Sequence, residues 1–533
     1  MERVSDIKIL ACFYIDDNED LKDNVGFNYV IAAVRQAGHN VEAIHDRFMN
    51  FDLQKIIEMK PQIVMFSLYD WYLAKTLQII RLIKENLKET TIIVGGPTVH
   101  FSAERLMQDC WYIDYAVYGE GEETVVQLAE NGKGSKAIPN LVYREDGRII
   151  KTDRKFIENL DLLPIPLSSI PQQYSNYLYV GGDRGCTGNC SFCTTKALWN
   201  KWRAKSNESI VDDLEFKVNK YNKRNIFFTI NSLDNPNLRI DKLKDLCQLI
   251  INRKIDVSFL VPLRAETYKN IDCNDIDLLK RAGLYGLFIG VEAGNEFDLK
   301  LYKKSCKLTD CYNSIDFYKK NNLYIEVGYI AVNPYSTLDR LSDNVRWLYE
   351  NKLSYYQKWI YSYYMPFRGC TLFDKIEKDG LLVDHGLELG LEYKYKNNEV
   401  ENFVKATNDY INSNRSSNLK KTSIYMEIDK LFAKLVNMKF KNDKYYTLSE
   451  EILEMKDEID FMLGEISEYN YKVYLELLQG VSRDPADKKL FTIMESYYNS
   501  SDFEKKLNNA KIILNTMIKK ALSFDKEVYS FMK

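Results

Sequence analysis

The 533-residue chain has few histidines and no long apolar run, and each absence excludes a class of protein or site. Four histidines are too few for a metal site built mainly from imidazole. No uninterrupted apolar run approaches the roughly 20 residues that a membrane-spanning helix needs. The first ten residues, MERVSDIKIL, lack the longer apolar stretch of a secretory signal. We therefore expect a cytoplasmic protein that has no membrane partner.

Neither sign of charge is in excess, because 73 basic residues stand against 76 acidic ones for a net charge of −3. This balance supplies no broad electrostatic attraction toward nucleic acid, so no nucleic-acid partner is expected. Hydrophobic residues make up 45% of the chain and charged residues 28%, as is ordinary for a globular protein with a buried core. The length is enough for about three domains.

The first 138 residues alternate apolar runs of strand length with helical patterns. The apolar runs lie at residues 7–13, 41–44, 63–68, 91–94 and 115–118. The helical patterns include residues 29–37, 53–59 and 73–87. Continuous apolar runs between helices are typical of a parallel sheet that is buried on both faces. The fold class predicted for residues 1–138 is therefore α/β, as a flavodoxin-like, doubly wound (Rossmann-like) domain.

Residues 139–171 change character, since prolines at 139, 164 and 166 interrupt any helix and predict a short hairpin followed by an extended linker. The alternation restarts at Tyr177. Its candidate strands are residues 178–181, 226–230, 257–261, 286–291, 324–331 and 359–363. Six β/α units predict a partial (β/α)6 barrel over residues 172–383.

The last part of the chain, residues 384–533, carries no strand signal. Its helical periodicity covers residues 423–440, 449–466, 488–500 and 503–532, with Lys and Glu on the outer faces. We predict an all-helical C-terminal region. These helices either cap the barrel and shape a substrate site or form a surface for a dimer or another partner.

Three of the ten cysteines, Cys186, Cys190 and Cys193, lie within eight positions on a loop that contains glycines and follows a predicted strand. Closely spaced thiolates hold iron–sulfur clusters, and small residues let the backbone wrap the inorganic core. Three ligands for four irons leave one iron open, which is a catalytic feature. The alternatives are chance clustering of buried thiols, or a zinc site that recruits a distant fourth ligand such as Cys247 or Cys273.

The pattern C-x3-C-x-(aromatic)-C, with Phe192 at the aromatic position, resembles the signature of the radical S-adenosylmethionine (SAM) superfamily. The resemblance implies a [4Fe-4S] cluster whose open iron is chelated by the amino and carboxylate groups of SAM, with Phe192 next to the cofactor. One-electron reduction, from a donor such as flavodoxin or ferredoxin, then generates a 5′-deoxyadenosyl radical that removes a hydrogen atom from the substrate.

Three polar residues near the ends of predicted barrel strands are candidate SAM contacts. Asn231 follows the strand at 226–230, where polar groups face the mouth of a barrel, as Asp234 does. Arg264 is suited to a charge-assisted contact with the cofactor carboxylate. Glu292, in the sequence IGVEAG, resembles the fourth-strand segment of the superfamily, where a polar residue approaches the cofactor. The alternative for each is a strand-end cap or a surface salt bridge.

The order of the pieces GGPTVH, IDYAVYGEGEETV, LDLLPIP and cysteine loop resembles the cobalamin-binding, methyltransferase-type radical SAM enzymes over residues 1 to about 380. In a doubly wound sheet, ligands bind outside the carboxyl ends of the strands. The candidate cobalamin contacts at that edge are Tyr69, Asp70, Gly95, Gly96, Thr98, Gly119, Glu120 and Gly121. No histidine fits D-x-H-x-x-G, so this motif supplies no lower ligand to cobalt, and the same absence fits a domain that has lost the cofactor.

The resemblance implies that the protein methylates a carbon centre of a small-molecule or peptide substrate and uses SAM both as methyl source and as radical source. A second possibility keeps the radical without methyl transfer, for cyclisation, oxidation, rearrangement or peptide crosslinking. A third is an iron–sulfur sensor or electron carrier. The predicted barrel argues against a carrier, because a carrier needs no cavity of substrate size.

Overall fold

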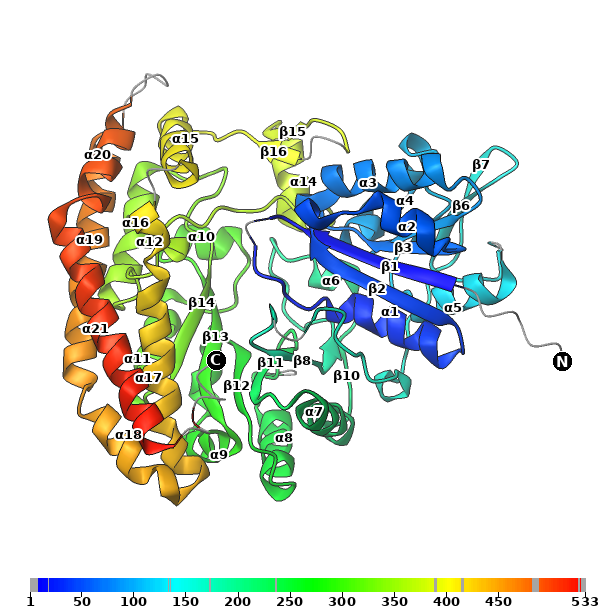
Figure 1. Ribbon diagram of the computed structural model, residues 1–533. Coiled ribbons are helices and arrows are strands. Elements are labelled where there is room, and N and C mark those ends of the chain that lie inside the picture. Colours follow the sequence, from blue (N-terminus) through cyan, green and yellow to red (C-terminus); the bar gives the residue numbers. More distant parts are fainter. Residues whose placement is uncertain are drawn as a thin grey trace.

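The structure is a computed structural model that describes residues 8–17, 19–132, 134, 136–171, 174–234, 237–387, 391–413, 417–481, 488–525 and 528. Three parts follow one another along the chain (Figure 1). A sheet domain lies on one side of a central barrel, and a group of long helices covers the barrel on the other side. No described helix is long and apolar enough to cross a membrane.

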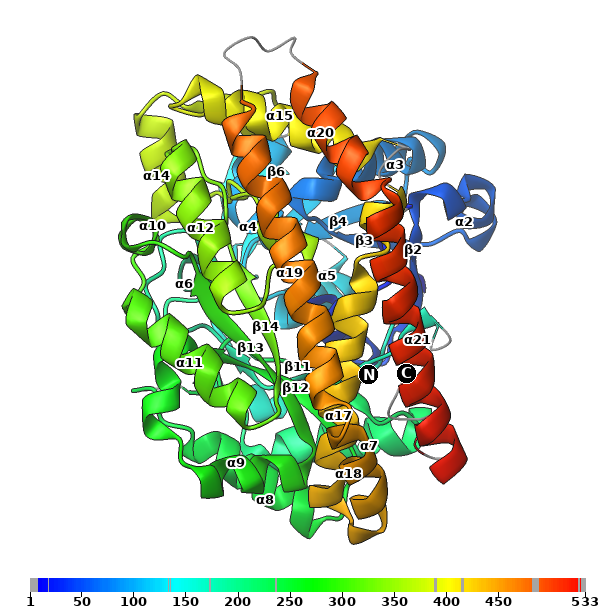
Figure 2. The same ribbon diagram turned by 90° about the vertical axis from the view of Figure 1, so that its left-hand side faces the viewer.

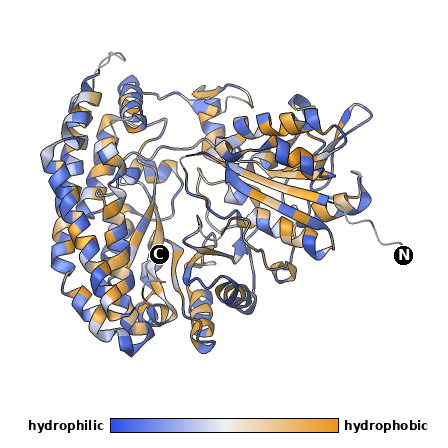
Figure 3. Cartoon of the chain, viewed as in Figure 1, coloured by the Kyte–Doolittle hydropathy of each residue, from blue (hydrophilic) through white to orange (hydrophobic). Residues whose placement is uncertain are grey.

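The N-terminal domain is built on a seven-stranded sheet in the order β2-β1-β3-β4-β5-β6-β7. Its parallel strands are β1 (Lys8–Ile15), β2 (Asn40–Arg47), β3 (Ile63–Ser67), β4 (Thr91–Gly95) and β5 (Tyr115–Val117). The central strands are buried on both faces and stand out as the most hydrophobic part of this domain (Figure 3). The predicted doubly wound parallel sheet is confirmed.

Helices cover both faces of this sheet. On one face lie α1 (Val25–Gln36) and α5 (Glu122–Asn131). On the other lie α2 (Leu53–Met59), α3 (Leu73–Asn86) and α4 (Pro97–Asp109). Their apolar stripes bury the alternating side chains of the strands, as a doubly wound sheet requires.

The hairpin predicted within residues 139–171 is present, but it is not a free linker. Its strands β6 (Leu141–Glu145) and β7 (Arg148–Lys151) form an antiparallel pair, and β6 also pairs antiparallel with β5. The hairpin therefore extends the sheet. Local sequence cannot indicate this, because the pairing depends on the exposed edge of a distant strand.

The second part contains five parallel strands in the order β14-β13-β12-β11-β8. The strands are β8 (Leu178–Gly181), β11 (Asn225–Thr229), β12 (Ser258–Arg264), β13 (Leu284–Glu292) and β14 (Tyr324–Tyr329). The longer helices between and after them are α7 (Asn207–Tyr221), α8 (Asp241–Asn252), α9 (Cys273–Ala282), α11 (Leu308–Lys320) and α12 (Leu338–Glu350). Five of the six predicted barrel strands are thus confirmed.

The predicted sixth strand at residues 359–363 is wrong. Gln357–Ile360 form a short helix, α13, and only a single parallel bridge joins Val332 to Tyr363 in the place of a sixth strand. Trp359 and Ile360 are both buried although they are neighbours in sequence. A short aromatic run of this kind is equally compatible with a buried strand and a buried helix by periodicity alone.

The C-terminal region is mainly helical but begins with a hairpin that the sequence did not predict. Strands β15 (Leu382–Asp384) and β16 (Leu391–Tyr393) pair antiparallel. Helix α14 (Thr371–Lys378) precedes the hairpin. The helices that follow it are α15 (Asn398–Asn412), α16 (Ser417–Lys420), α17 (Ser423–Lys441), α18 (Tyr446–Leu453), α19 (Lys456–Gln479), α20 (Lys489–Tyr498) and α21 (Ser501–Phe524). The helix predicted at 449–466 is two helices, α18 and α19. The last residues of the helix predicted at 503–532 lie outside the described residues.

Helices α17, α19 and α21 run side by side along the barrel (Figure 2). Their buried side chains and those of the barrel form one continuous hydrophobic core. Helix α17 packs directly on β13 and β14. The C-terminal helices therefore cover the barrel, which answers one of the alternatives left by the sequence.

Candidate functional site

The cysteine loop, residues 185–194, begins directly after the short strand β9 (Asp183–Arg184). Gly185 has φ of +90°, and a Cβ there would lie 2.4 Å from the carbonyl oxygen of Lys201, so only glycine fits this turn. Ser191 anchors the loop, since its N–H donates to the carbonyl of Tyr302 (2.9 Å) and its hydroxyl to that of Leu301 (2.6 Å). The loop thus rests on the end of α10 (Glu296–Leu301).

The three cysteines are half-buried free thiols. Gly188 lies between two of them, because a Cβ added there would be 3.4 Å from Cys186 Sγ and 3.9 Å from Cys190 Sγ. Burial raises the pKa of Cys190 to about 11, the positive charge of Lys304 opposes this rise, and the charges of Cys186 and Cys193 also act on it. Cys190 is therefore a protonated thiol that becomes a ligand when a cation offsets the cost of its negative charge.

The donor set fits a cluster better than a single ion. Among the described residues, no three His, Cys, Asp or Glu side chains surround one point closely enough to hold a metal ion. A four-iron cluster needs no such convergence, because each cysteine binds a different iron. Cys247 is buried in α8 and Cys273 is exposed at the start of α9, and neither joins a metal-holding group among the described residues.

Glu292 ends β13 with a strained backbone, at φ of +73°. Its carboxylate lies over two neighbouring glycines, since a Cβ on Gly290 or on Gly328 would come within 3.0 or 3.1 Å of Glu292 Oε1. Lys304 Nζ lies 3.6 Å from the same oxygen, and both side chains are largely buried. Burial lowers the pKa of Lys304, but Glu292 and the other acidic groups around it, Glu266 among them, together outweigh burial and raise it. The lysine is therefore charged.

Arg264 is fixed by a buried carboxylate. Asp234 is fully buried, and its Oδ2 accepts hydrogen bonds from the backbone N–H (3.0 Å) and Nε (3.2 Å) of Arg264. The hydroxyls of Ser232 and Thr267 also donate to Asp234. The guanidinium is thus oriented by one acid at the ends of β11 and β12.

Asn231 is held by Asp183, whose Oδ1 accepts its backbone N–H (2.8 Å) and its side-chain amide (3.0 Å). Trp202 Nε1 donates to the other carboxylate oxygen of Asp183 (3.1 Å). Phe192 packs edge-on against Tyr302, with ring centroids 5.5 Å apart. Asn231 therefore faces the barrel mouth, whereas Phe192 packs against the hydrophobic core.

A cavity of about 630 Å³ lies between the carboxyl ends of the N-terminal strands and the mouth of the barrel. Its N-terminal side is lined by residues 24–27, 65–67, 95–97 and 119–122, among others. Its barrel side is lined by residues 181–184 and 227–231 with Leu198, Trp199, Leu260, Pro262 and Phe288. A second cavity of about 620 Å³ lies at the opposite ends of β3 and β4, around residues 60–63 and 86–91, and holds none of the predicted site residues.

The cavity contains six of the eight predicted cobalamin contacts: Tyr69, Gly95, Gly96, Gly119, Glu120 and Gly121. Asp70 and Thr98 are not among its lining residues. Gly96 has φ of +99°, and a Cβ there would lie 2.8 Å from the carbonyl oxygen of Leu68. The glycines therefore keep the rim of the cavity flat, which suits a large planar ligand that approaches the backbone. Asn231 is the predicted SAM contact that also lines this cavity.

Two family models match the chain in the same order as the structural parts. The model of the B12 binding domain matches residues 20–129. The model of the Radical SAM superfamily matches residues 183–347, which contain the cysteine loop. This is a radical SAM enzyme with a B12-binding domain. The radical SAM domain implies a [4Fe-4S] cluster and SAM, and the B12-binding domain implies cobalamin, as predicted.

Relatives of this radical SAM enzyme are about a quarter identical to it over the aligned part of the chain. An uncharacterized methyltransferase of Pyrococcus horikoshii is 25% identical over 380 residues, which are 67% of this chain and 79% of the relative. An anaerobic magnesium-protoporphyrin IX monomethyl ester cyclase of Cereibacter sphaeroides is 23% identical over 67% of this chain and 61% of the cyclase. The hopanoid C-3 methylase of Methylococcus capsulatus is 25% identical over 58% and 60%. The match thus spans only about three fifths of the latter two.

Solved structures share the fold. The cobalamin-dependent SAM radical enzyme OxsB, with aqua-cobalamin and SAM bound, superimposes with a TM-score of 0.68 at 16% identity and covers 98% of this chain and 81% of OxsB. The radical SAM methyltransferase TsrM of Kitasatospora setae, with cobalamin and a [4Fe-4S] cluster bound, has a TM-score of 0.56 at 15% identity and covers 70% and 78%. At these identities the likeness concerns the arrangement of the chain.

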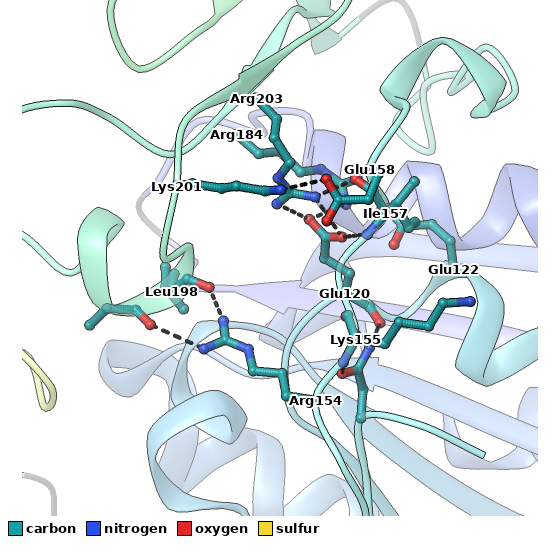
Figure 4. Close-up of polar contacts among 12 residues, drawn as sticks. Glu120, Glu122, Arg154, Lys155, Ile157, Glu158, Arg184, Leu198, Lys201 and Arg203 are labelled. Carbon is teal, nitrogen blue, oxygen red and sulfur yellow. Dashed lines mark hydrogen bonds and ion pairs between the residues drawn. The ribbon is translucent and has the colours of Figure 1, made fainter. Parts of the chain in front are cut away.

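A buried network of ion pairs joins the B12-binding domain to the radical SAM barrel (Figure 4). Arg184, two residues before Cys186, pairs with Glu120 (3.0 Å) and with Glu122. Arg203, on β10 (Arg203–Ala204), holds both carboxylate oxygens of Glu120 at 2.6 and 3.1 Å. Burial opposes ionisation of Glu120, but Arg203 and Arg184 together lower its pKa. The side chain of Glu120, which we predicted to contact cobalamin, is therefore engaged by two arginines.

Four residues that surround the predicted site were not predicted from the sequence: Asp183, Arg184, Arg203 and Lys304. Arg184 carried a signal, since it stands in the strand directly before the first cysteine. Lys304 carried none, because its partner Glu292 lies on another element. His100 also lines the cavity, and burial lowers its pKa to about 4, so its imidazole is neutral at physiological pH.

The buried carboxyl of Asp183 predicts a pH effect. Burial raises its pKa from 3.8 to about 6, so the folded protein holds this proton more tightly than the unfolded chain. Stability from this group is present below about pH 4 and is lost as the pH rises to about 6. Over that pH window, we expect the free energy of unfolding of wild type to fall by about 2–3 kcal/mol more than that of Asp183→Asn.

Differential scanning calorimetry of both proteins between pH 4 and 7 measures the difference. Asp457→Asn, at an exposed site at the start of α19, is the control and should follow wild type. A constant difference between wild type and Asp183→Asn across the window would contradict the assignment.

Proposed function

We propose that this radical SAM enzyme methylates a carbon centre of a small-molecule or peptide substrate, with SAM as methyl source and cobalamin as a required cofactor. One observation carries the proposal. The cavity at the strand ends of the B12-binding domain continues into the mouth of the radical SAM barrel, next to the cysteine loop. A methyl carrier and a radical source held at the two sides of one cavity both reach a substrate placed between them.

The residues divide by what they would hold. The backbone at Gly95, Gly96, Gly119 and Gly121 offers a flat seat for a corrinoid. Cys186, Cys190 and Cys193 would bind three irons of the cluster, and Asn231, Arg264 and Glu292 stand at the barrel mouth, where they would orient SAM. When bound, the cluster supplies one-electron cleavage of SAM, and the corrinoid supplies methyl transfer.

The proposed activity is tested on protein reconstituted with iron, sulfide and cobalamin, in the presence of SAM and either dithionite or a flavodoxin system. We expect both S-adenosylhomocysteine and 5′-deoxyadenosine, and formation of the former should require cobalamin. 5′-Deoxyadenosine alone, at every cobalamin concentration, would exclude methyl transfer and favour the cyclisation or oxidation class. Neither product from a fully loaded cluster would favour a sensor or electron carrier.

The position of the Glu292 carboxylate predicts that a variant without its charge binds SAM more weakly. Its position between Gly290 and Gly328, with Lys304 alongside, suits a contact with the ammonium group of the cofactor. Glu292→Gln keeps the shape and removes the charge, so we expect the Kd of SAM to rise about 10- to 100-fold. Equilibrium dialysis with labelled SAM measures the change.

The matched control is Glu326→Gln, a half-buried carboxylate on the neighbouring strand β14. It should leave SAM binding within about twofold of wild type. If both variants weaken SAM binding equally, the loss comes from the general electrostatic field of the barrel. The assignment of Glu292 to the cofactor would then be wrong.

A further inference from the structure

The barrel side of the cavity has an apolar wall. Phe227 on β11, Leu260 and Pro262 on β12, and Phe288 on β13 point inward from the strands. Phe227 is 40% exposed, whereas its neighbours Ile226 and Phe228 are buried in the core that the barrel strands share with the helices. Because side chains alternate along a strand, the exposed surface of Phe227 is the one that faces the cavity. A large exposed aromatic ring inside a barrel is suited to apolar ligand surface.

Helix α17 closes the lumen below this wall. Leu260, Tyr285 and Tyr324 on the inner face of the barrel pack with Ala433 of α17, and Met426 of α17 lies against the same group. Figure 1 shows α17 running along β13 and β14, where further strands would close a complete barrel. The C-terminal helices therefore contribute the floor of the substrate space, and that floor is also apolar and aromatic.

The lysines of α17 that point at the barrel are already engaged. Lys430 Nζ donates to the hydroxyl of Tyr177 (2.7 Å). Lys434 Nζ donates to Asn225 Oδ1 (2.8 Å) and lies 4.8 Å from the ring centre of Tyr285. Burial lowers the pKa of Lys434 well below its ordinary value. Neither ammonium group is offered to a ligand.

Two cations are among the described residues that line the cavity, and both contact side chains of the N-terminal domain. Arg184 is held between Glu120 and Glu122. Lys205 is buried, with its ammonium 5.3 Å from the ring centre of Tyr29. On the barrel wall, Glu326 stands in register with Phe288 and adds a negative charge. An anionic group placed against the apolar wall and floor of the barrel would lose its hydration without gaining a cation.

We infer that the substrate is predominantly apolar and carries no anionic group, so that phosphate and carboxylate compounds are excluded. The inference rests on the proposed function, because it names the substrate class of that reaction. Hydrogen-atom removal suits such a molecule, since a carbon without neighbouring polar groups offers no acidic proton for ionic chemistry. The apolar wall and floor hold the chain or ring, and Glu326 can accept a hydrogen bond from a hydroxyl or amine.

The test compares two probes that share one aromatic frame. The protein loaded with cluster, SAM and cobalamin is dialysed to equilibrium against neutral N-phenyl-1-naphthylamine and, separately, against anionic 1-anilinonaphthalene-8-sulfonate, with bound probe measured by chromatography. We expect one neutral molecule per chain, bound at least about tenfold more tightly than the sulfonate. Equal binding of the two probes would overturn the exclusion of anions.

The variant Phe227→Asp tests whether the neutral probe binds in the lumen of the barrel. Because Phe227 is 40% exposed, a charge there is compatible with folding, and we expect the neutral probe to bind at least about tenfold more weakly. Phe216→Asp makes the same change at a residue 45% exposed on the outer helix α7, and it should bind the probe like wild type. Unchanged binding in Phe227→Asp, with native circular dichroism, would place the probe elsewhere and overturn the proposal.

These measurements are separate from those of the proposed reaction. Failure to form S-adenosylhomocysteine would reject methyl transfer even if the neutral probe bound as expected. Conversely, preference for the anionic probe would reject an apolar substrate and leave cobalamin-dependent formation of S-adenosylhomocysteine untouched.

Discussion

Replacement of Cys190 by alanine is expected to abolish cleavage of SAM and to leave a protein without a stable [4Fe-4S] cluster. Cys190 stands between Cys186 and Cys193 on a loop that Ser191 ties to the end of α10. The cluster needs three thiolates from this loop, and no other described Cys, His, Asp or Glu joins them to replace one.

The cluster variant is judged by iron content, by the visible absorption of the reconstituted protein and by 5′-deoxyadenosine formation. All three should fall to the level of a protein that was never reconstituted. Cys273→Ala, which changes an exposed free thiol at the start of α9, is the control and should match wild type. A variant of Cys190 that still produced 5′-deoxyadenosine would show that the loop does not hold the catalytic cluster.

The second large effect is expected at Arg184, where the two domains meet. Replacing Arg184 with methionine leaves Glu120 and Glu122 buried with only Arg203 to balance them. Removing one partner of a buried ion pair costs about 3–5 kcal/mol, because the remaining charge stays desolvated. We expect a lower thermal unfolding midpoint and a marked loss of bound cobalamin, since the same segment at residues 119–122 lines the cavity.

The double variant Arg184→Met/Glu122→Gln separates charge from shape. It restores the balance of one acid and one arginine, so it should recover more than half of the lost stability. Lys201→Met breaks a neighbouring but exposed pair with Glu158 and should cost only about 0–1 kcal/mol. If Lys201→Met and Arg184→Met were equally destabilised, burial of the network would not be what stabilises the domain junction.

The buried ion-pair network at the domain junction also has a functional consequence if cobalamin binds as proposed. Glu120 and Glu122 flank a glycine of the cavity rim, and Arg184 leads directly into the cysteine loop. The network therefore fixes the position of the cavity rim relative to the cluster loop. Proximity and orientation of this kind contribute strongly to rates, and a shift of about 1 Å can cost about a hundredfold.

The sequence by itself determined the features that depend only on residues close together in the chain. The spacing of Cys186, Cys190 and Cys193 identifies the cluster loop, because its ligands are close in the chain. Apolar runs and glycines predict the parallel sheet and the rim of the cavity, because burial on both faces requires a continuous run. The order of these local patterns was enough to indicate the cluster loop and the B12-binding domain before any contact was known.

Only the tertiary structure decided what depends on pairs that are distant in sequence. Arg203 meets Glu120 across 83 positions, and Lys430 meets Tyr177 across 253. Hydrogen bonding at a distant sheet edge attached the β6–β7 hairpin, and packing made residues 357–360 a helix instead of a sixth strand. Periodicity reports which face of an element is buried but not what covers it. For that reason the cluster loop could be predicted from the sequence, whereas the domain junction and the α17 floor could not.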